Sequence, residues 1–457
     1  MSSNMRIVFL CFNLYTSCLL ICSSKLCLAG DTLNIGEKIL GNETFTNLVS
    51  AGKVFELGFF TPSNNDASQR YLGIWHHMQG ERSRQPEEQT AVWVANRDSP
   101  VAVGSIGVFQ IAQDGNLVVL DTSGNNKSYW STNYKVNGSS PKNRTVKLMD
   151  SGNLVLYDDE LMGVKLWESF ENPTDTFLPG MKMDRNLKLT SWKSAYNPSS
   201  GDFTFKTRDN RFIILNRSEI HWESEEHRKH DQLDDISFEV YNLLTNFSLL
   251  AQNSMNNFSS PERRNKPIEI PIEQYNNKRL FLNSTGVIQW VEGDLAVIWK
   301  QPRSKCLTYN VCGNFASCND NDSVGCKCLP GFYNDNQGEE DSSLQAGCTR
   351  RKTASCTEND MAFLNLTMIK TGRPDIKVTV QYEENCTSVC VGMCPRCQAY
   401  SYAPLPTNYQ RDVPLNCWIW THSLTTLKEE YTAWDDDRRL IVIVDKSDIG
   451  MHMMFKL

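Results

Sequence analysis

Residues 306–318 read CLTYNVCGNFASC and open a block of six cysteines that ends at residue 348. So many cysteines in about forty residues leave too few apolar side chains for a hydrophobic core, so covalent cross-links must hold this segment together. The spacing alone leaves the pairing of the cysteines open. The six are Cys306, Cys312, Cys318, Cys326, Cys328 and Cys348.

Metal binding is a poor explanation of this block. A zinc ribbon needs two Cys-x-x-Cys knuckles, and the block has none. A calcium-binding module needs acidic ligands just before its first cysteine, where the chain reads QPRSK at residues 301–305. With CLPGF at residues 328–332, the spacing closely resembles a metal-free EGF-like domain. The resemblance implies the bridges Cys306–Cys318, Cys312–Cys326 and Cys328–Cys348.

The chain has 457 residues, of which 40% are hydrophobic and 22% charged, as expected of a globular protein with several domains. Residues 1–29 have the pattern of a secretory signal: Arg6 precedes the apolar run Ile7–Cys22, and Ala29 and Gly30 are small. The remaining twelve cysteines all lie beyond residue 305, an even number, as a disulfide framework requires. No later stretch has the length of a membrane span or a lipid-anchor signal, so we expect a secreted protein.

The mature chain is acidic. Lys and Arg number 46 and Asp and Glu 53, and removal of Arg6 and Lys25 with the signal leaves a net charge of −9. Nucleic acid is therefore not an expected partner, because binding to phosphates needs a basic face. Together with the signal and the cysteines, eleven Asn-x-Ser/Thr triplets imply a glycosylated extracellular surface. Their asparagines are Asn42, Asn126, Asn137, Asn143, Asn216, Asn246, Asn257, Asn283, Asn321, Asn365 and Asn385.

Residues 30–158 contain an internal repeat. DGNLVVL at residues 114–120 recurs as SGNLVLY at residues 151–157, a spacing of 37 residues, which indicates a β architecture built from similar hairpins. With LGIW at 72–75 and WVANR at 93–97, the segment closely resembles a bulb-type mannose-binding lectin domain. The resemblance implies a β-prism of three four-stranded sheets.

In that family the sugar motif is Gln-x-Asp-x-Asn-x-Val-x-Tyr, whose polar side chains hydrogen-bond the hydroxyls of mannose. The first copy has Ala112 and Leu120 in the Gln and Tyr positions, and the second has Met149 and Ser151 in the Gln and Asp positions. We favour the interpretation that the remaining polar residues are turn and strand residues of the prism, because Asx-Gly turns need no ligand. The candidate sugar ligands of this degenerate site are Asp114, Asn116, Asn153 and Tyr157.

Residues 159–304 open with LWESFENPTDTFLPG at 166–180, followed by SWKS at 191–194 and GDFTF at 201–205. This segment strongly resembles the S-locus glycoprotein region of plant S-domain receptor kinases. The resemblance implies a second lectin-like β unit, and the alternating residues 279–290 fit it.

The second cysteine cluster runs from Cys356 to Cys417, and Cys386, Cys390 and Cys394 have the i, i+4 spacing of one helix face. With QAYSY at 398–402 and CWIW at 417–420, residues 350–445 resemble an α+β PAN/apple domain. The Cys-x-x-Cys run from Cys394 to Cys397 lacks the βαβ context of a redox motif. The resemblance implies the bridges Cys356–Cys417, Cys386–Cys397 and Cys390–Cys394.

Nothing in the sequence predicts a metal site, a cofactor or a catalytic centre. His221, His227 and His230 lie in a charged stretch that we interpret as a solvated loop, because no helix register or carboxylate supports a metal site. The kinase, P-loop, Gly-x-Ser-x-Gly and His-Glu-x-x-His signatures are missing from the sequence, so an enzyme is not expected.

The order of the segments is more specific than any single motif. It resembles the extracellular half of a plant G-type lectin S-receptor-like serine/threonine kinase, without the membrane span and kinase. Relatives with a span lie in the plasma membrane. The expected mainly β domains are a signal at 1–29, a bulb-type lectin domain at 30–158, an S-locus region at 159–304, an EGF-like domain at 305–349, a PAN/apple domain at 350–445 and a tail at 446–457.

The resemblance implies an extracellular recognition module, with family roles that include recognition of pollen and defence signalling. The expected partners are a peptide or glycan ligand, a related receptor kinase ectodomain, or a second copy bound through the PAN domain. Trp418, Trp420 and Tyr400 are candidate contact residues, because aromatic side chains are enriched at interface hot spots, although rings of this size are also often core residues. The alternative function is a secreted mannose-binding defence lectin.

Overall fold

The structure is a computed structural model of the chain. It describes residues 30–42, 46–62, 69–77, 91–102, 104–122, 127–134, 143–159, 163–209, 211–224, 235–245, 277–293, 296–320, 325–334, 347–350, 357, 359–366, 369–402, 415–429 and 439–447. The expected signal at 1–29 lies outside these residues. Among the described residues, no helix has the length and apolar character needed to cross a membrane.

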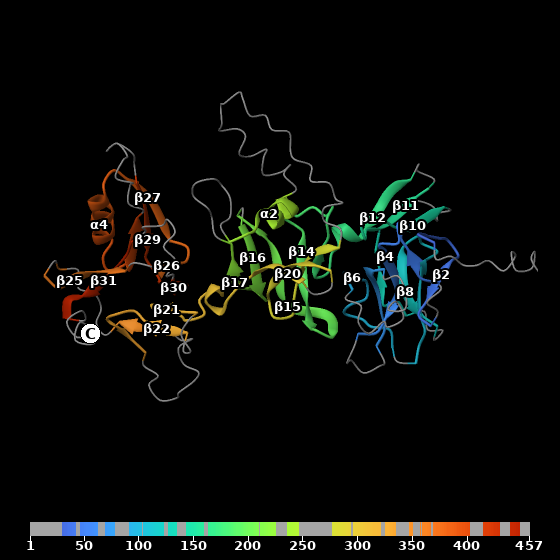
Figure 1. Ribbon diagram of the computed structural model, residues 1–457, viewed down its shortest axis with the longest axis horizontal. Coiled ribbons are helices and arrows are strands. Elements are labelled where there is room, and N and C mark those ends of the chain that lie inside the picture. The colour runs from blue at the N-terminus through green and yellow to red at the C-terminus, as the bar shows by residue number, and fades with distance from the viewer. Residues whose placement is uncertain are drawn as a thin grey trace, which may run out of the picture. The chain divides into compact units, whose positions relative to one another are not determined.

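The chain forms two compact units (Figure 1). The first contains Met1–Glu219 and Ser224–Lys300, and the second contains Ile220–Glu223 and Gln301–Leu457. Each unit is described by itself below.

The first part of the N-terminal unit is a β-prism of three four-stranded sheets, as the resemblance to bulb-type lectins implied. Apolar side chains on alternating strand positions, such as Leu33, Ile39 and Leu57, are buried inside the prism. In strand order, the sheets are β1 (Thr32–Asn34), β10 (Arg144–Leu148), β11 (Leu154–Asp158) and β12 (Val164–Glu168); β2 (Lys38–Leu40), β7 (Gly107–Ile111), β8 (Leu117–Asp121) and β9 (Trp130–Ser131); and β3 (Leu48–Val49), β4 (Phe55–Phe60), β5 (Tyr71–His76) and β6 (Trp93–Val94).

Three tryptophans join the three sheets. Trp93, Trp130 and Trp167 lie on β6, β9 and β12, the last strand of each sheet, and contact one another edge to face with ring centroids 5.6–5.9 Å apart. This arrangement suits the quadrupoles of the indole rings. Because each ring comes from a different sheet, the cluster holds the prism closed.

The repeated sequence forms the same hairpin turn twice. The amide of Ala112 donates to the carbonyl of Asn116 at 2.8 Å, and the amide of Met149 donates to the carbonyl of Asn153 at 2.9 Å. The glycines inside these turns, Gly115 and Gly152, have φ angles of 80° and 84°. A glycine is needed there because other residues rarely adopt positive φ. The 37-residue repeat therefore encodes two equivalent hairpins, β7–β8 and β10–β11.

The second part of the N-terminal unit is the expected lectin-like β region, with core residues that include Phe177, Phe205 and Trp290. Its hairpin β18–β19 turns at Asn283–Val287 with the same amide-to-carbonyl bond, at 3.0 Å. Its elements are η4 (Ser169–Glu171), β13 (Thr176–Phe177), β14 (Lys188–Ser194), β15 (Asn197–Arg208), β16 (Arg211–Asn216), α2 (Phe238–Thr245), β18 (Lys278–Leu282), β19 (Ile288–Glu292) and β20 (Ala296–Gln301); β17 (Glu219–Glu223) lies mostly in the second unit.

The EGF-like part of the C-terminal unit has the bridges Cys306–Cys318, Cys312–Cys326 and Cys328–Cys348, as the resemblance implied. It shares a sheet with the PAN part, in the order β22-β21-β30-β26, and β21 runs parallel to β30. The two parts therefore form one folded body. The EGF-like elements are η7 (Lys305–Leu307), β21 (Ala316–Cys318), β22 (Cys326–Cys328), β23 (Phe332–Tyr333) and β24 (Thr349–Arg350).

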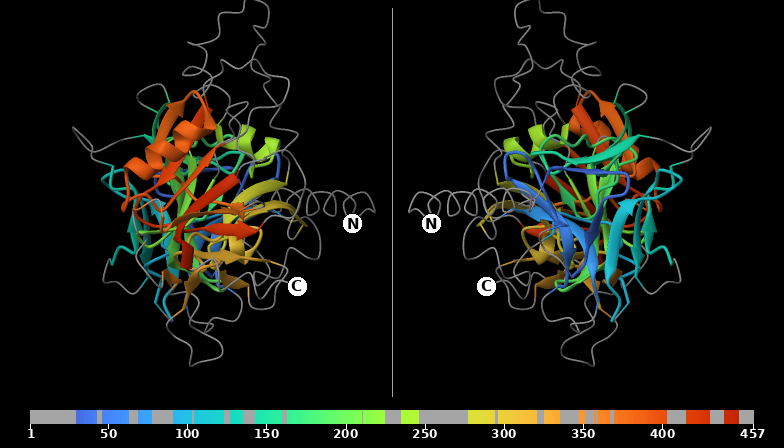
Figure 2. Two further views of the ribbon diagram at one scale, coloured as in Figure 1. Left: turned by 90° about the vertical axis from the view of Figure 1, so that its left-hand side faces the viewer. Right: turned by 90° about the vertical axis from the view of Figure 1, so that its right-hand side faces the viewer.

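The PAN part is a five-stranded antiparallel sheet in the order β25-β31-β28-β29-β27 with a helix, α4, on one face. Figure 2 shows α4, in orange, beside the orange and red strands. The opposite face packs against the EGF-like part, where Phe315 and Leu329 share a core with Trp418 and Val442. The PAN elements are β25 (Met361–Leu366), β26 (Ile369–Lys370), β27 (Ile376–Val380), α4 (Glu383–Gly392), β28 (Ala399–Tyr402), β29 (Leu415–Trp420), β30 (Leu427–Glu429) and β31 (Arg439–Asp445).

The helical cysteine face is shorter than expected. Cys386 and Cys390 lie in α4 and are fully buried, but the helix ends at Gly392, before Cys394. The residue before a proline disfavours helical backbone, and Pro395 follows Cys394. Only two of the three thiols therefore share the helix face.

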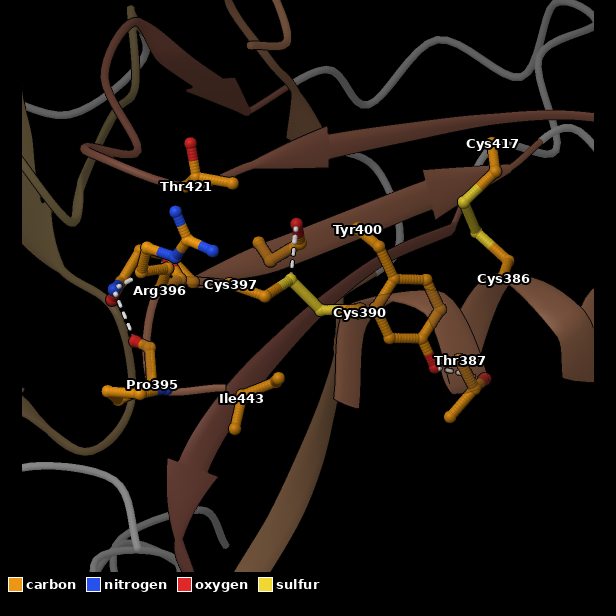
Figure 3. The surroundings of a disulfide bond; sticks show 12 residues. Cys386, Thr387, Cys390, Pro395, Arg396, Cys397, Tyr400, Cys417, Thr421 and Ile443 are labelled. Atoms are coloured by element: carbon orange, nitrogen blue, oxygen red, sulfur yellow. Dashed lines mark hydrogen bonds between the residues drawn. A yellow bond between two sulfur atoms is a disulfide. The ribbon is translucent and has the colours of Figure 1, made fainter. Parts of the chain in front are cut away.

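The PAN bridges differ from those that the resemblance implied. The three expected bridges, Cys356–Cys417, Cys386–Cys397 and Cys390–Cys394, are all wrong. Helix α4 crosses the sheet so that Cys386 faces β29 and Cys390 faces the start of β28 (Figure 3). Cys394 is also disulfide-bonded, and Cys356 lies outside the described residues. The observed pairs are Cys386–Cys417 and Cys390–Cys397.

Candidate functional site

The first lectin turn places Asp114 and Asn116 side by side. The backbone amide of Asn116 donates to Asp114 Oδ1 at 3.0 Å, and its side-chain nitrogen donates to Asp114 Oδ2 at 2.9 Å. These two hydrogen bonds from Asn116 hold the pKa of the Asp114 carboxyl below its ordinary value, because they stabilise the charged form. Asp114 itself is exposed, while Asn116 is 6% exposed.

The other end of the Asn116 amide is also used inside the protein. Its oxygen accepts hydrogen bonds from Thr132 Oγ1 at 2.8 Å and from the backbone amide of Tyr134 at 2.7 Å. Beneath the turn, the buried Arg144 donates to the carbonyl of Gly115 at 2.7 Å. One amide N–H and the oxygen of Asn116 are used within the fold, so this side chain connects the β7–β8 turn to the segment after β9.

The second lectin turn is closed in the same way. The side-chain nitrogen of Asn153 donates to Glu168 Oε2 at 2.6 Å, and its oxygen accepts from Ser169 Oγ and from the amide of Phe170, both at 3.2 Å. Burial tends to raise the pKa of Glu168, but hydrogen bonds from Lys165 and Asn153 outweigh burial and lower it. Asn153 is 9% exposed and connects the β10–β11 turn to the segment after β12.

Tyr157, the last candidate sugar ligand, does not join Asn153 at this turn. It lies at the far end of β11, where it pairs across the sheet with Thr145 and Lys165. The four candidates therefore form two separate groups, one in each hairpin. In each hairpin a mannose molecule would have to compete with hydrogen bonds that the protein already makes.

A buried contact between the two lectin-like regions was missed by the sequence reasoning. Arg97 follows β6 and is 8% exposed. Its guanidinium donates to the carbonyls of Pro198 at 2.8 Å, Thr190 at 3.0 Å and Ser191 at 2.6 Å. All three acceptors lie on β14 or β15, so Arg97 joins the prism to the second region. In WVANRDSP, at residues 93–100, polar residues directly follow an apolar strand, and this is the sequence feature that could have indicated the contact.

Two carboxylates complete this contact. Asp98 accepts hydrogen bonds from the amide of Ser200 at 2.6 Å and from its hydroxyl at 2.8 Å. Asp175 is buried, and burial raises its pKa while the positive charge of Arg97 acts in the opposite direction. The prism and the lectin-like region are thus held together by charged side chains as well as by apolar packing.

The predicted contact residues of the PAN domain are core residues. Trp418 and Trp420 are 5% and 4% exposed and pack against the EGF-like part. Tyr400 is 4% exposed, faces α4, and bonds Thr387 Oγ1 at 2.7 Å (Figure 3). The hypothesis that these rings form a partner surface is therefore wrong. Sequence could not decide this, because both uses of an aromatic residue look alike in a strand.

The second lectin-like region also has large exposed apolar side chains. Val297 and Ile298 on β20 are 47% and 48% exposed, and Phe238 at the start of α2 is 58% exposed. Trp299 Nε1 donates to the carbonyl of Asp235 at 3.1 Å, so β20 lies beside the segment that leads into α2. Strand β20 is the outer strand of the sheet β13-β18-β19-β20. A contiguous exposed apolar patch marks a surface that binds other proteins, whereas single exposed apolar side chains are common.

The described residues bring together one group of possible metal ligands, Cys312, Cys318 and Cys326, and all three are in disulfides. His221 is half-buried, and burial lowers its pKa. His227 and His230 lie outside the described residues.

Six of the eleven glycosylation triplets have a described asparagine. Five of the six are exposed, and Asn283 is half-buried in the β18–β19 turn. The exposed ones are Asn42, Asn143, Asn216, Asn365 and Asn385; Asn126, Asn137, Asn246, Asn257 and Asn321 lie outside the described residues.

Comparisons with known proteins agree with this architecture. The chain matches family models described as D-mannose binding lectin over residues 90–195, S-locus glycoprotein domain over 239–336 and PAN-like domain over 356–427. It is 39% identical over 434 residues to a G-type lectin S-receptor-like serine/threonine-protein kinase of Arabidopsis thaliana, which covers 92% of this chain and 48% of that protein. The chain thus spans about half the length of this kinase relative.

An S-locus-specific glycoprotein of Brassica oleracea var. alboglabra is 32% identical over 421 residues, and the match covers 85% of this chain and 87% of that protein. This match covers most of both chains, so the relationship is not confined to a single domain. The chain belongs to the S-locus glycoprotein family, whose lectin, S-locus and PAN domains it shares with the ectodomains of S-domain receptor kinases.

Proposed function

We propose that this chain is an extracellular recognition module that binds a protein partner, either a peptide ligand or the ectodomain of a related receptor. The observation that carries the proposal is the internal use of the lectin turns. The amide groups of Asn116 and Asn153 each make three hydrogen bonds within the protein. The turns stabilise the fold, and the partner binds at another surface of the protein.

The free energy of these hydrogen bonds favours a protein-binding module over a mannose lectin. A sugar that took over either asparagine would displace up to three hydrogen bonds, each with a net value of about 1 kcal/mol. A millimolar complex has a binding free energy of only about 4 kcal/mol in total. We therefore expect no mannose binding tighter than the millimolar range at either turn.

Calorimetry with mannose and with a mannose disaccharide tests this part of the proposal. The expected result is no saturable heat at ligand concentrations below a few millimolar. Micromolar binding that disappears in Asn116→Ala or Asn153→Ala would contradict the proposal and establish a mannose-binding lectin.

The protein-binding surface that we propose is the outer strand β20. Val297 and Ile298 are neighbours on this strand, so their side chains point to opposite faces, and both are about half exposed. A strand of this kind suits the addition of a partner's extended segment to the sheet edge, with main-chain hydrogen bonds on the strand and apolar contacts on both faces. The disulfides of the C-terminal unit suit an oxidising compartment outside the cell.

The test is Ile298→Lys, measured for binding to a panel of related S-domain ectodomains by biolayer interferometry. Val164→Lys is the matched control, since Val164 is 49% exposed and lies on β12, the last strand of a prism sheet. We expect the β20 variant to lose binding at least tenfold and the control to keep it. Equal binding by both variants would remove β20 from the proposal.

A further inference from the structure

Two of the eleven glycosylation triplets share a feature that the others lack. Phe281 stands two residues before Asn283, and Phe363 stands two residues before Asn365, in both cases within the sequence Phe-Leu-Asn. At the other nine triplets this position is occupied by a residue that is not aromatic. In a strand, residues two apart point to the same face, so a ring and a glycan can meet there.

Strand β25 presents Phe363 and Asn365 on one face. Ala362, Leu364 and Leu366 pack against the core shared with the EGF-like part, so the alternate residues point to the face that carries α4. Phe363 is 42% exposed, and Asn365 is exposed.

The ring of Phe363 is supported from the sheet side. It contacts the ring of Tyr400 at 6.4 Å between centroids and 75° between planes. On the neighbouring strand, β31, Phe363 pairs with Ile443 and Asn365 pairs with Ile441, both of which are buried. Tyr400 is itself held by Thr387 at 2.7 Å. Phe363 is therefore a supported aromatic ring with an exposed part, at the outer edge of the sheet.

We propose that the first N-acetylglucosamine of an N-linked glycan on Asn365 lies over the exposed part of the Phe363 ring. Thr367 completes the triplet in the sequence. Residues two apart on a strand are about 6.6–6.8 Å apart, a span that a sugar ring on the Asn365 side chain can bridge. One face of the sugar ring carries C–H groups, and its contact with the phenyl ring removes apolar surface from water. Because the sugar is covalently attached, the contact costs no association entropy.

A glycan on Asn365 would also protect the edge of the PAN sheet from pairing with another strand. Strand β25 is the first strand in the order β25-β31-β28-β29-β27, and an exposed outer strand with an apolar ring is a site for unwanted strand pairing. A bulky glycan at Asn365 covers both the ring and the edge. The glycan is thus a structural part of the PAN domain.

Asn283 provides a weaker second case. Its side-chain oxygen accepts hydrogen bonds from the amides of Thr285 and Val287, at 3.0 Å and 2.9 Å, which fixes the amide over the β18–β19 turn. Phe281 is half-buried, and the guanidinium of Arg279 lies 5.8 Å from its ring centre. With one side of the ring occupied by a cation, less of it is free for a sugar. We therefore expect a smaller effect at Asn283 than at Asn365.

The experiment uses the full chain secreted from human cells in which glycans are kept in the high-mannose form. Glycopeptide mass spectrometry measures the occupancy of Asn365, and calorimetry measures Tm. We expect Asn365→Gln to lower the Tm of the C-terminal unit by about 2–5 °C. Asn216→Gln is the matched control, because Asn216 is exposed at the end of a strand and the residue two before it, Ile214, is buried and not aromatic. The control should leave Tm unchanged.

Two further measurements separate stacking from other effects of the glycan. Trimming with endoglycosidase H leaves one N-acetylglucosamine on each asparagine, and we expect this protein to keep the full Tm. The effect of Asn365→Gln should disappear in the Phe363→Ala background, because a contact between two groups produces a coupling energy. An unoccupied Asn365, a Tm that falls on trimming, or an effect independent of Phe363 would each overturn the proposal.

Discussion

Arg97→Ala is the substitution with the largest expected effect on the N-terminal unit. It removes three hydrogen bonds from a guanidinium that is 8% exposed, and it leaves the carbonyls of Thr190, Ser191 and Pro198 without this donor. It also removes the positive charge beside the buried Asp175. Hydrogen bonds to charged groups contribute about 1.5–3 kcal/mol each. Because such contributions overlap, the measured loss for a broken buried charged contact is about 3–5 kcal/mol.

The assay is thermal and urea unfolding of the secreted chain. For a unit of this size, each kcal/mol shifts Tm by about 2–4 °C, so we expect a decrease on the order of 10 °C. Arg97→Lys should lose a substantial part of the same stability, because an ammonium keeps the charge but cannot reproduce the planar set of donors. Arg217→Ala is the control, since the ion pair between Arg217 and Asp202 has side chains that are 77% and 57% exposed. We expect no measurable change from this control. A shift below about 2 °C for Arg97→Ala would refute the conclusion that this contact joins the two lectin-like regions.

Three further predictions concern other parts of the chain. Arg350 lies 5.2 Å and 5.0 Å from the ring centres of Phe315 and Phe332, so Arg350→Ala should destabilise the C-terminal unit by about 1–2 kcal/mol in urea unfolding, and an unchanged midpoint would contradict this. Because the pKa of Asp114 is lowered, the contribution of this carboxylate to the free energy of unfolding is complete above its unfolded pKa of about 3.9 and is lost as pH falls through the folded pKa. The stability difference between wild type and Asp114→Asn should therefore shrink on acidification. A difference that stays constant with pH would refute the role of Asn116 as the hydrogen-bond donor to Asp114. Peptide mapping of the unreduced protein should recover Cys394 linked to the remaining cysteine at position 356, with no reactive thiol on titration of the denatured protein; two free thiols would contradict this pairing.

The repeat and the turns could be read from sequence because they depend on neighbouring residues. The glycines of Asp114-Gly115-Asn116 and Ser151-Gly152-Asn153 suit the positive φ of the turn, and the alternating residues that follow specify a strand. The bridges of the EGF-like part agree with the resemblance to EGF-like domains, which supplied the pairing that the spacing alone left open. The turns are local features, so the order of residues along the chain contains the information for them.

The PAN bridges and the role of the aromatic residues could not be read in this way. The partner of Cys386 depends on how α4 crosses β29, and that crossing is set by packing between segments about thirty residues apart. Likewise Trp418 and Trp420 alternate along a strand in the same way whether they face a partner or a core. Their burial depends on the EGF-like part, which packs on that face of the sheet.

The sequence by itself determined the domain order, the prism hairpins and the loss of the glutamine from both sugar motifs. Only the tertiary structure decided that Asn116 and Asn153 make hydrogen bonds within the fold, since their partners Tyr134 and Phe170 lie 18 and 17 residues away, after β9 and in η4. The same holds for Arg97, whose acceptors lie about a hundred residues further along the chain. A hydrogen bond needs two groups within about 3 Å of each other, and for residues so far apart in sequence only the packing of the sheets brings them to that distance.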